Sequence, residues 1–167
     1  MKGFLVPLVS TVLVGFGAFQ LFAAVTESST NVPLAIPDAG NVDSTLNFSV
    51  NGTISDVNLD VNIAHTWNDD IEIRLTSPSV AVQLLWQDCG GSGDNLQMTL
   101  DQDAAAISTC PTTGPITGSL RPTDGTGAGP VAASGSFDAF DGSSSGGVWT
   151  LNVTDDSSIC TGTVAST

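Results

Sequence analysis

Residues 57–75, VNLDVNIAHTWNDDIEIRL, decide the fold class of this 167-residue chain. Apolar side chains occupy every second position over residues 57–63 and again over 71–75, with polar residues between them. A period of two is the pattern of a β-strand that buries one face. The stretch therefore predicts two strands and no helix. Residues of the apolar phase are expected in the core: Ile63, Trp67 and Ile73.

The same alternation recurs along the rest of the chain. It is found in four further segments: 46–50, 80–86, 96–100 and 149–153. The segments 90–93, 109–135 and 142–147 are rich in glycine, serine and threonine and are expected to be links. Strands with one polar and one apolar face bury the apolar face against a second sheet. We therefore expect an all-β sandwich whose core also contains Trp149 and Leu151.

The charge is strongly acidic, with 17 Asp and Glu residues against three Lys and Arg residues and a formal net charge of −14. A nucleic-acid backbone needs Lys and Arg to neutralise it, and an anionic membrane surface attracts the same residues, so both are excluded as partners. Solubility of an exported protein is one explanation of the acidity. The other is that Asp-rich loops hold a hard cation such as Ca²⁺.

One candidate loop for Ca²⁺ is the glycine-rich stretch 90–93. Four aspartates surround it: Asp88, Asp94, Asp101 and Asp103. Several oxygen ligands on a flexible loop suit Ca²⁺, although no EF-hand spacing is present. The alternative is ordinary turn chemistry, in which an Asp side chain bonds its own backbone. Zinc is disfavoured, because dispersed cysteines and one histidine lack the paired spacing of zinc sites.

The first 24 residues have the layout of a secretory signal peptide. Met1 and Lys2 form a short charged region, residues 3–22 are nearly all apolar, and Ala23 and Ala24 offer small residues for cleavage. We expect a signal peptide helix over residues 1–24 and a secreted product, extracellular, periplasmic or at the cell surface. The alternative is an uncleaved membrane anchor, since the apolar stretch is about long enough to span a bilayer.

The three cysteines are Cys89, Cys110 and Cys160. Export makes a disulfide possible, and an odd number leaves one thiol over. Cys89 and Cys110 flank the expected strand 96–100, and they are the pair that we expect to be bridged. Cys160 is then either a buried free thiol or a residue whose partner lies outside this chain.

No catalytic residue is expected. The single histidine, His65, lies on the apolar face of its strand, where a hydrogen-bonded structural role is commoner than a general base. No Gly-x-Ser-x-Gly turn is present. The neighbouring carboxylates at 69–70 and 155–156 point to opposite faces of an extended chain, so spacing alone does not pair them. We therefore expect a chain that is not an enzyme by itself.

Three segments in order resemble the P-domain (P/Homo B domain) of proprotein convertases, which are kexin-type, subtilisin-like serine proteases, and of bacterial secreted proteins. They are PLAIPD at 33–38, HTWNDDIEIRLTSP at 65–78, and FDG at 140–142 followed by GVWTLNVTD at 147–155. The family usually has glycine and leucine where this chain has Asp69 and Ile71. The motif residues expected to be structural are His65, Thr66, Asp70, Ser77, Pro78, Gly147, Trp149 and Asp155.

The resemblance covers residues 31–167 and implies a jelly-roll-like, galactose-binding-like β-sandwich. It implies a non-catalytic accessory module that stabilises and regulates a subtilisin-like serine endopeptidase, and so an association with proteolysis. The partner would be such a catalytic domain or another domain of the same polypeptide. Because the signal peptide directly precedes the domain, the alternative is a stand-alone, Ca²⁺-dependent adhesion sandwich that binds a glycan or a protein.

The end of the chain is expected to cut the domain short. The family's last segment is a Gly-Thr turn followed by a strand that contains a tryptophan. Residues 161–167, TGTVAST, reach the start of that strand and stop. The resemblance therefore implies a domain truncated at its C-terminal strand, with the partner of Cys160 downstream.

Overall fold

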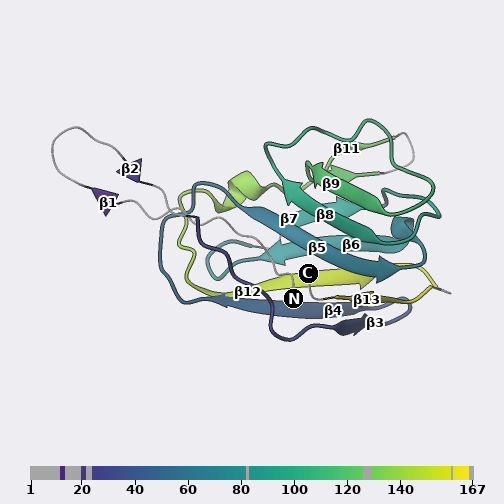
Figure 1. Cartoon of the computed structure of the whole chain (residues 1–167), viewed down its shortest axis with the longest axis horizontal. Coiled ribbons are helices and arrows are strands. Elements are labelled where there is room, and N and C mark those ends of the chain that lie inside the picture. Colours follow the sequence, from purple (N-terminus) through teal and green to yellow (C-terminus); the bar gives the residue numbers. More distant parts are fainter. Residues whose placement is uncertain are drawn as a thin grey trace.

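The computed structural model describes residues 12–13, 20–21, 24–81, 83–125, 129–158 and 160–165. Two β-sheets face each other and enclose one hydrophobic core (Figure 1). The described residues contain no α-helix, and their only helical turns are two short 3-10 helices, η1 (Asn68–Asp70) and η2 (Phe137–Phe140). The all-β sandwich predicted from the sequence is therefore confirmed.

The first sheet has six strands in the order β11-β10-β7-β6-β12-β4. Its longest strand is β12, which pairs antiparallel with β6 on one side and with β4 on the other. As a result β4 forms one edge of this sheet. The bounds are β4 (Asn41–Phe48), β6 (Ile71–Thr76), β7 (Gln83–Gln87), β10 (Thr123–Asp124), β11 (Val131–Ala132) and β12 (Gly147–Asp155).

The second sheet has five strands in the order β3-β13-β5-β8-β9. Its long central strand, β5, is antiparallel to β13 and β8, whereas β8 and β9 run parallel. The bounds are β3 (Leu34–Ile36), β5 (Asn58–His65), β8 (Leu96–Asp101), β9 (Ile116–Leu120) and β13 (Gly162–Val164).

The apolar faces of the two sheets meet as the alternation predicts. Four of the five residues expected in the core are buried: Ile63, Ile73, Trp149 and Leu151. The indole Nε1 of Trp149 donates a hydrogen bond of 2.8 Å to the carbonyl oxygen of Ser145. Its ring packs against Phe48 and Phe140, with centroids 5.8 and 5.0 Å away. Trp149 therefore combines apolar burial with a satisfied polar atom.

The prediction for the fifth residue, Trp67, is wrong. Its side chain is 42% exposed. β5 ends at His65, and the chain then turns into η1, so residue 67 lies beyond the last paired residue of the strand. Alternation along the sequence gives the phase of a side chain but not the point at which the opposing sheet stops covering it.

The prediction that residues 109–135 are only a link is also wrong, because they contain β9, β10 and β11. Residues 117–119 of β9 are exposed, so this edge strand lacks the apolar alternation that identified the others. In β7, a register shift against β6 lets both Leu85 and Trp86 enter the core. This bulge breaks the period of two expected over 80–86, of which residue 82 lies outside the described residues.

The helix expected over residues 1–24 is not found where this segment is described. β1 (Val12–Leu13) and β2 (Gln20–Leu21) pair antiparallel instead. The sequence between them contains Gly15 and Gly17, whose helix propensity is low. The remaining residues up to 23 lie outside the described part, and the signal peptide stays a prediction. Among the described residues, no helix is long and apolar enough to span a bilayer.

The last strand, β13, lies inside its sheet between β3 and β5. Val164 is buried, and the Ala165 N–H donates a hydrogen bond of 2.9 Å to the carbonyl oxygen of Asn62. The segment that was expected only to reach the final strand thus forms a short interior strand. A longer closing strand, and a downstream partner for the half-buried free thiol of Cys160, stay predictions.

Two neighbours on β12 test this description of the core. Trp149→Ala is expected to lower the free energy of unfolding by about 3–5 kcal/mol, because it leaves a cavity between Phe48 and Phe140. Val148→Ala, at a position 56% exposed, is expected to change it by less than about 0.5 kcal/mol. Urea unfolding followed by fluorescence and circular dichroism measures both. Equal costs for the two variants would contradict the assignment of the two faces of β12.

Candidate functional site

The motif residue His65 lies at the end of β5 with its side chain buried. Its Nδ1 is 2.7 Å from the carbonyl oxygen and 3.2 Å from the backbone nitrogen of Trp67. Its Nε2 is 3.2 Å from Oδ2 of Asp155. The protonated ring donates to both oxygens, and the neutral ring donates to Asp155 and accepts from the Trp67 N–H. In either protonation state both ring nitrogens are engaged within the protein.

The partner of His65, Asp155, belongs to the opposite sheet, at the end of β12. Both side chains of this pair are fully buried. The second carboxylate oxygen of Asp155 accepts the Ser157 N–H at 3.2 Å. The two sheets are therefore tied at this end by a hydrogen-bonded, buried pair. It joins the second and third of the motifs found in the sequence.

Further acidic side chains surround the pair. Together they form the acidic pole: Asp69, Asp70, Glu72, Asp88, Asp124, Asp155 and Asp156. Burial, and then the repulsion of negative neighbours, raises the pKa of Asp88 and of Asp156 above the ordinary 3.8. Burial also raises the pKa of Asp70, although a hydrogen bond from the Cys160 thiol acts in the opposite direction. The acidic pole therefore concentrates negative charge that is costly at neutral pH.

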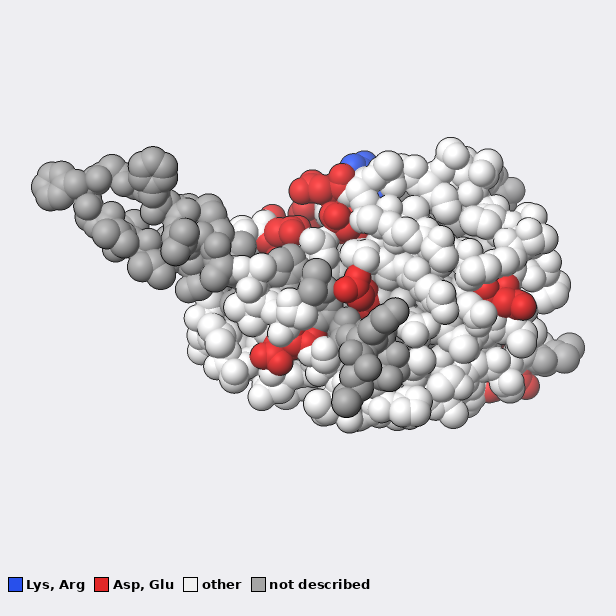
Figure 2. Space-filling view, in the orientation of Figure 1, with Lys and Arg blue, Asp and Glu red and all other residues white. Residues whose placement is uncertain are grey.

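Positive charge does little to balance this acidity. Arg74, which is partly exposed, pairs with Glu72 at the acidic pole. In Figure 2 acidic side chains are spread over the visible face of the sandwich, while basic side chains are confined to a small area at its upper edge. The described surface thus has the acidic character that the composition predicts.

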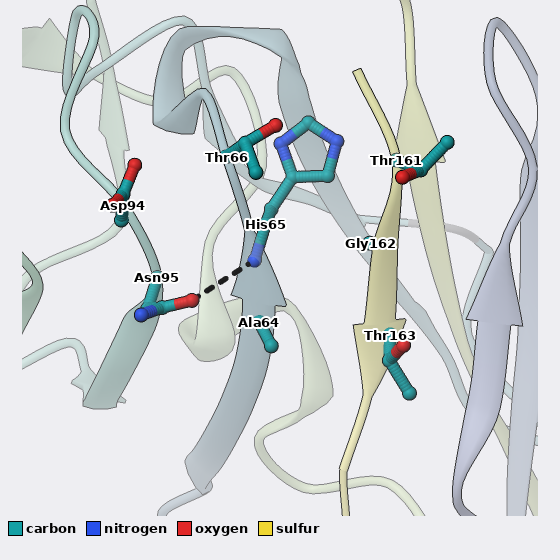
Figure 3. A pocket seen from close by; sticks show the side chains of 8 residues that line it. All are labelled: Ala64, His65, Thr66, Asp94, Asn95, Thr161, Gly162 and Thr163. Atoms are coloured by element: carbon teal, nitrogen blue, oxygen red, sulfur yellow. Dashed lines mark hydrogen bonds between the residues drawn. The ribbon is translucent and has the colours of Figure 1, made fainter.

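A small hollow of about 240 Å³ lies beside His65 on the five-stranded sheet (Figure 3). It is lined by Ala64, His65, Thr66, Asp94, Asn95 and residues 161–163. Small-molecule sites usually occupy about 300–1,000 Å³ and are mostly apolar. This hollow is smaller, and its lining surface is divided about equally between polar and apolar atoms, so its geometry does not mark it as a site for a small molecule.

Asn95, which the sequence analysis did not single out, holds this end of the sandwich together. Its Oδ1 accepts the His65 N–H at 3.1 Å, and its own N–H donates to the His65 carbonyl oxygen at 3.0 Å. Its carbonyl oxygen accepts from Asn68 Nδ2 and from the Ile116 N–H. Its φ of 69° is in the left-handed region, which asparagine tolerates better than most residues. The feature of the sequence that could have indicated this role is an asparagine shortly after the glycine-rich stretch 90–93.

The glycine-rich loop 90–93 packs against η1. A Cβ on Gly90 would lie 2.5 Å from Cβ of Asn68, and a Cβ on Gly93 would lie 2.6 Å from the carbonyl oxygen of Gly114. The N–H groups of Asn68 and Asp69 donate to carbonyl oxygens of Gly93 and residue 91. Close backbone approach therefore explains glycine at these positions without a metal ion.

The four aspartates expected to surround a Ca²⁺ ion do not meet at one point. Asp94 precedes β8 and Asp101 ends it, so an extended strand separates them by roughly 20 Å. Asp88 belongs to the acidic pole, whereas Asp103 interacts with Asp56 at the other end of the sandwich. Within the described residues no group of three or more His, Cys, Asp or Glu side chains is placed to hold a metal ion.

Three other motif residues, Ser77, Pro78 and Gly147, lie at the ends of β6 and β12 that are far from the His65–Asp155 pair. The Ser77 Oγ accepts the backbone N–H groups of residues 79 and 80, which fixes the turn after β6. Gly147 has a φ of 115°, and a Cβ there would lie 2.7 Å from Cγ of Pro78. Glycine is thus required on both conformational and steric grounds. The motif residues form two separate structural groups rather than one centre.

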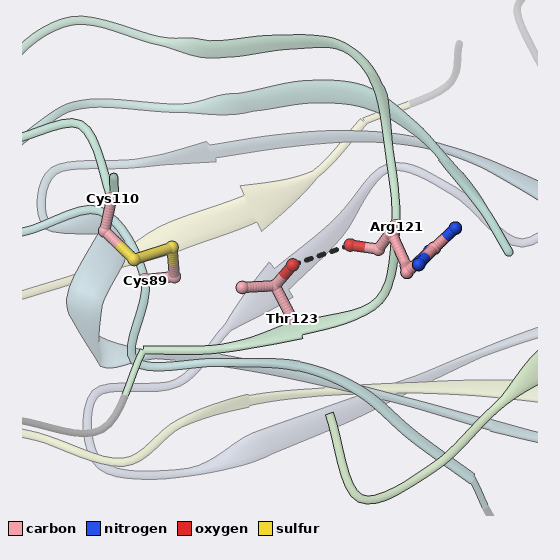
Figure 4. The surroundings of a disulfide bond; sticks show 4 residues. All are labelled: Cys89, Cys110, Arg121 and Thr123. Atoms are coloured by element: carbon pink, nitrogen blue, oxygen red, sulfur yellow. Dashed lines mark hydrogen bonds between the residues drawn. A yellow bond between two sulfur atoms is a disulfide. The ribbon is translucent and has the colours of Figure 1, made fainter. Parts of the chain in front are cut away.

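The expected disulfide between Cys89 and Cys110 is confirmed (Figure 4). The Cα atoms are 5.0 Å apart, within the distance that a bridge requires. Beyond the bridge, Arg121 Nε donates to the Gln102 carbonyl oxygen at 2.9 Å, and the Thr123 hydroxyl donates to the Arg121 carbonyl oxygen at 2.6 Å. These contacts hold the connection from β8 to β9 and β10, whose sequence has little apolar content.

The arrangement around His65 favours a structural role. A general base needs a ring nitrogen within hydrogen-bond reach of the proton that it accepts. Both nitrogens of His65 are occupied, and no serine, threonine or cysteine side chain is hydrogen-bonded to the ring in the described part of the chain. The pair instead offers a fixed, hydrogen-bonded connection between the two sheets.

A double-mutant cycle tests this connection. His65→Gln and Asp155→Asn are each expected to lower the free energy of unfolding by about 3–5 kcal/mol, because each leaves a buried polar partner uncompensated. The double variant is expected to cost less than the sum by more than about 1 kcal/mol. Chemical denaturation of the four proteins gives the coupling. Additive costs would show that the two side chains do not stabilise each other.

The acidic pole predicts a pH dependence of stability. The folded chain keeps protons on Asp88 and Asp156 at a pH where the unfolded chain has released them. Their contribution to the free energy of unfolding therefore falls as the pH rises from 3.8 through the raised pKa, and it stays low above that window.

Asp156→Asn isolates this effect. It is expected to stabilise the chain at pH 7 by less than about 1 kcal/mol, the range for exposed charges, and the gain should shrink as the pH approaches the ordinary pKa of a carboxyl group. Asp94→Asn removes an exposed carboxylate at the same end but outside the acidic pole and serves as the control. Urea unfolding between pH 4 and pH 8 measures both. A gain that is independent of pH would contradict the electrostatic explanation.

No family model, curated protein or solved structure matches the chain at a significant level. Support for a function therefore comes from the motif residues and from the geometry in which the fold places them.

Proposed function

We propose that this chain is a non-catalytic accessory module of an exported, proteolysis-associated protein, similar to the P-domain of proprotein convertases. In this proposal the sandwich has a jelly-roll-like topology and works beside a subtilisin-like serine endopeptidase domain, which it stabilises and regulates. The observation that carries the proposal is the buried His65–Asp155 pair, because it joins two sequence motifs across the sandwich.

The structural roles of the other motif residues support the same proposal. Ser77 fixes a turn, Gly147 leaves space for Pro78, and Trp149 is fully buried. In a structural module, the motif residues are expected to stabilise the turns and the core of the fold. A motif that encodes a catalytic centre would instead converge on one cleft.

The bridge between Cys89 and Cys110 supports export. Disulfides form and persist in oxidising compartments, and Cys89 is fully buried next to the core. Together with the N-terminal leader predicted from residues 1–24, the bridge supports an extracellular, periplasmic or cell-surface location.

A fusion experiment tests the accessory role. Residues 25–167 would be placed after a kexin-type catalytic domain from which its own P-domain has been deleted. The fusion is expected to restore a folded, active protease with a higher thermal midpoint than the catalytic domain alone. The same fusion carrying Trp149→Ala is the control and is expected to lose most of the gain. Equal midpoints with and without the sandwich would reject the accessory role.

The isolated chain is expected to show no peptidase activity on casein or on a panel of fluorogenic peptides. Cleavage that is abolished by His65→Ala, with the fold retained, would overturn the proposal. If the fusion fails and the folded chain binds a glycan array only with Ca²⁺ present, the stand-alone adhesion module is the correct alternative.

A further inference from the structure

Residues 29–31 lie along the outer edge of β4. Ser29 Oγ is 2.6 Å from Oγ of Ser44 and 3.1 Å from the carbonyl oxygen of Thr45. Asn31 Oδ1 accepts the Thr45 N–H at 3.2 Å, and its Nδ2 donates to the Asp43 carbonyl oxygen at 3.4 Å. We call this segment, Ser29–Asn31, the strap.

The strap forms hydrogen bonds to the backbone groups at the outer edge of β4 with its side chains rather than with its own backbone. The Asn31 amide offers one acceptor and one donor in a plane, as a peptide group of a neighbouring strand would. It meets the outward N–H of Thr45 and the outward carbonyl of Asp43 in that way. A side-chain amide thus takes the place of a strand at the centre of an eight-residue edge strand.

Such an edge is a docking surface when it is uncovered. A long edge strand presents backbone donors and acceptors that pair readily with another strand. β4 carries only one charged side chain, Asp43, and contains no proline, so little along the strand itself opposes pairing. The Asn31 bonds to β4 lie at the exposed surface, whereas the Ser29 bonds to Ser44 and Thr45 are partly buried.

The most favourable partner for this edge is β4 of a second copy. Thr45 points its backbone groups outward, so by the alternation of an antiparallel ladder Asp43 and Asn47 do the same. A two-fold axis at Thr45 pairs most of the strand and sets Asp43 of each copy opposite Asn47 of the other. A carboxylate then faces an amide, whereas a two-fold axis at Asp43 would bring two carboxylates together.

We propose that the strap is a displaceable cover that keeps the chain monomeric. When the strap is displaced, the β4 edge joins β4 of a second copy in an antiparallel pair centred on Thr45. The six-stranded sheets of the two copies would then become one continuous sheet. This inference is independent of the accessory role, because it depends only on β4 and the strap.

The first experiment removes the strap's hydrogen bonds in the full chain. Ser29→Ala/Asn31→Ala is expected to dimerise in a concentration-dependent manner, while the unchanged chain stays monomeric. Sedimentation velocity and light scattering at about 0.15 M salt measure this, since screening over about 8 Å weakens repulsion between acidic copies. Thr30→Ala is the matched control, because Thr30 is an exposed residue of the strap whose side chain has no hydrogen bond to β4 among the described residues. Asn31→Leu, which removes both the acceptor for the Thr45 N–H and the donor to the Asp43 carbonyl oxygen, is a second way to release the strap.

The second experiment tests the register in the strap-released chain. Asn47→Asp sets a second carboxylate against Asp43 of the other copy and is expected to weaken the dimer about threefold to tenfold. Asn47→Lys sets an ammonium group there and is expected to strengthen the dimer by a similar factor. Both changes are made at an exposed position, so the fold should be retained.

Opposite effects of the two Asn47 substitutions, with Thr30→Ala monomeric, would support the proposal. It would be overturned if both strap-released chains stayed monomeric while folded. It would also be overturned if the unchanged chain dimerised equally well, or if the two Asn47 substitutions changed the dissociation constant in the same direction.

Discussion

The buried pair of His65 and Asp155 constrains how the two sheets meet, because it joins the end of β5 in one sheet to the end of β12 in the other. Apolar packing between sheets is non-directional and sets no register by itself. The pair adds direction: Nε2 of a residue ending β5 meets Oδ2 of a residue ending β12 at 3.2 Å. Since a buried charged group without its partner costs several kcal/mol, alternative alignments of the two sheets are disfavoured.

Several neighbouring features follow from the need to bury this imidazole. The chain after β5 must turn so that the Trp67 backbone reaches Nδ1, and η1 makes that turn. Gly162 faces the ring, and a Cβ there would lie 2.5 Å from its Cδ2. Asn95 closes the end of β5 through its side chain. Trp67 contributes its backbone to His65, while its side chain, which lies beyond the paired end of β5, stays exposed.

The sequence was sufficient for the elements whose two faces differ. β5, β6, β8 and β12 alternate, and alternation follows directly from burial on one side. The strand expected over 46–50 was only partly right, because β4 spans Asn41–Phe48 and Val50 is 43% exposed beyond its end. It was insufficient for β9, whose exposed side chains carry no such signal and whose parallel pairing with β8 is a long-range contact. The role of His65 could be expected from its phase, but its partner lies 90 residues away and only the fold brings it within reach. The loop 90–93 was considered for Ca²⁺ because four aspartates are close to it in sequence, but in the fold Asp94 and Asp101 lie at opposite ends of β8.

The distribution of roles among the acidic residues explains why a chain with 17 carboxylates shows no metal cluster in its described part. Asp155 is hydrogen-bonded to His65, Glu72 forms an ion pair with Arg74, and Asp60 accepts a hydrogen bond from the hydroxyl of Thr99. Others cap turns, as Asp101 does by accepting the N–H of Asp103 at 2.8 Å. A carboxylate that already accepts protein donors has fewer lone pairs for a cation. The acidity of this sandwich is thus divided between structural bonds and the acidic pole, where burial first, and then the negative neighbours, raise the pKa of Asp70 and of Asp156.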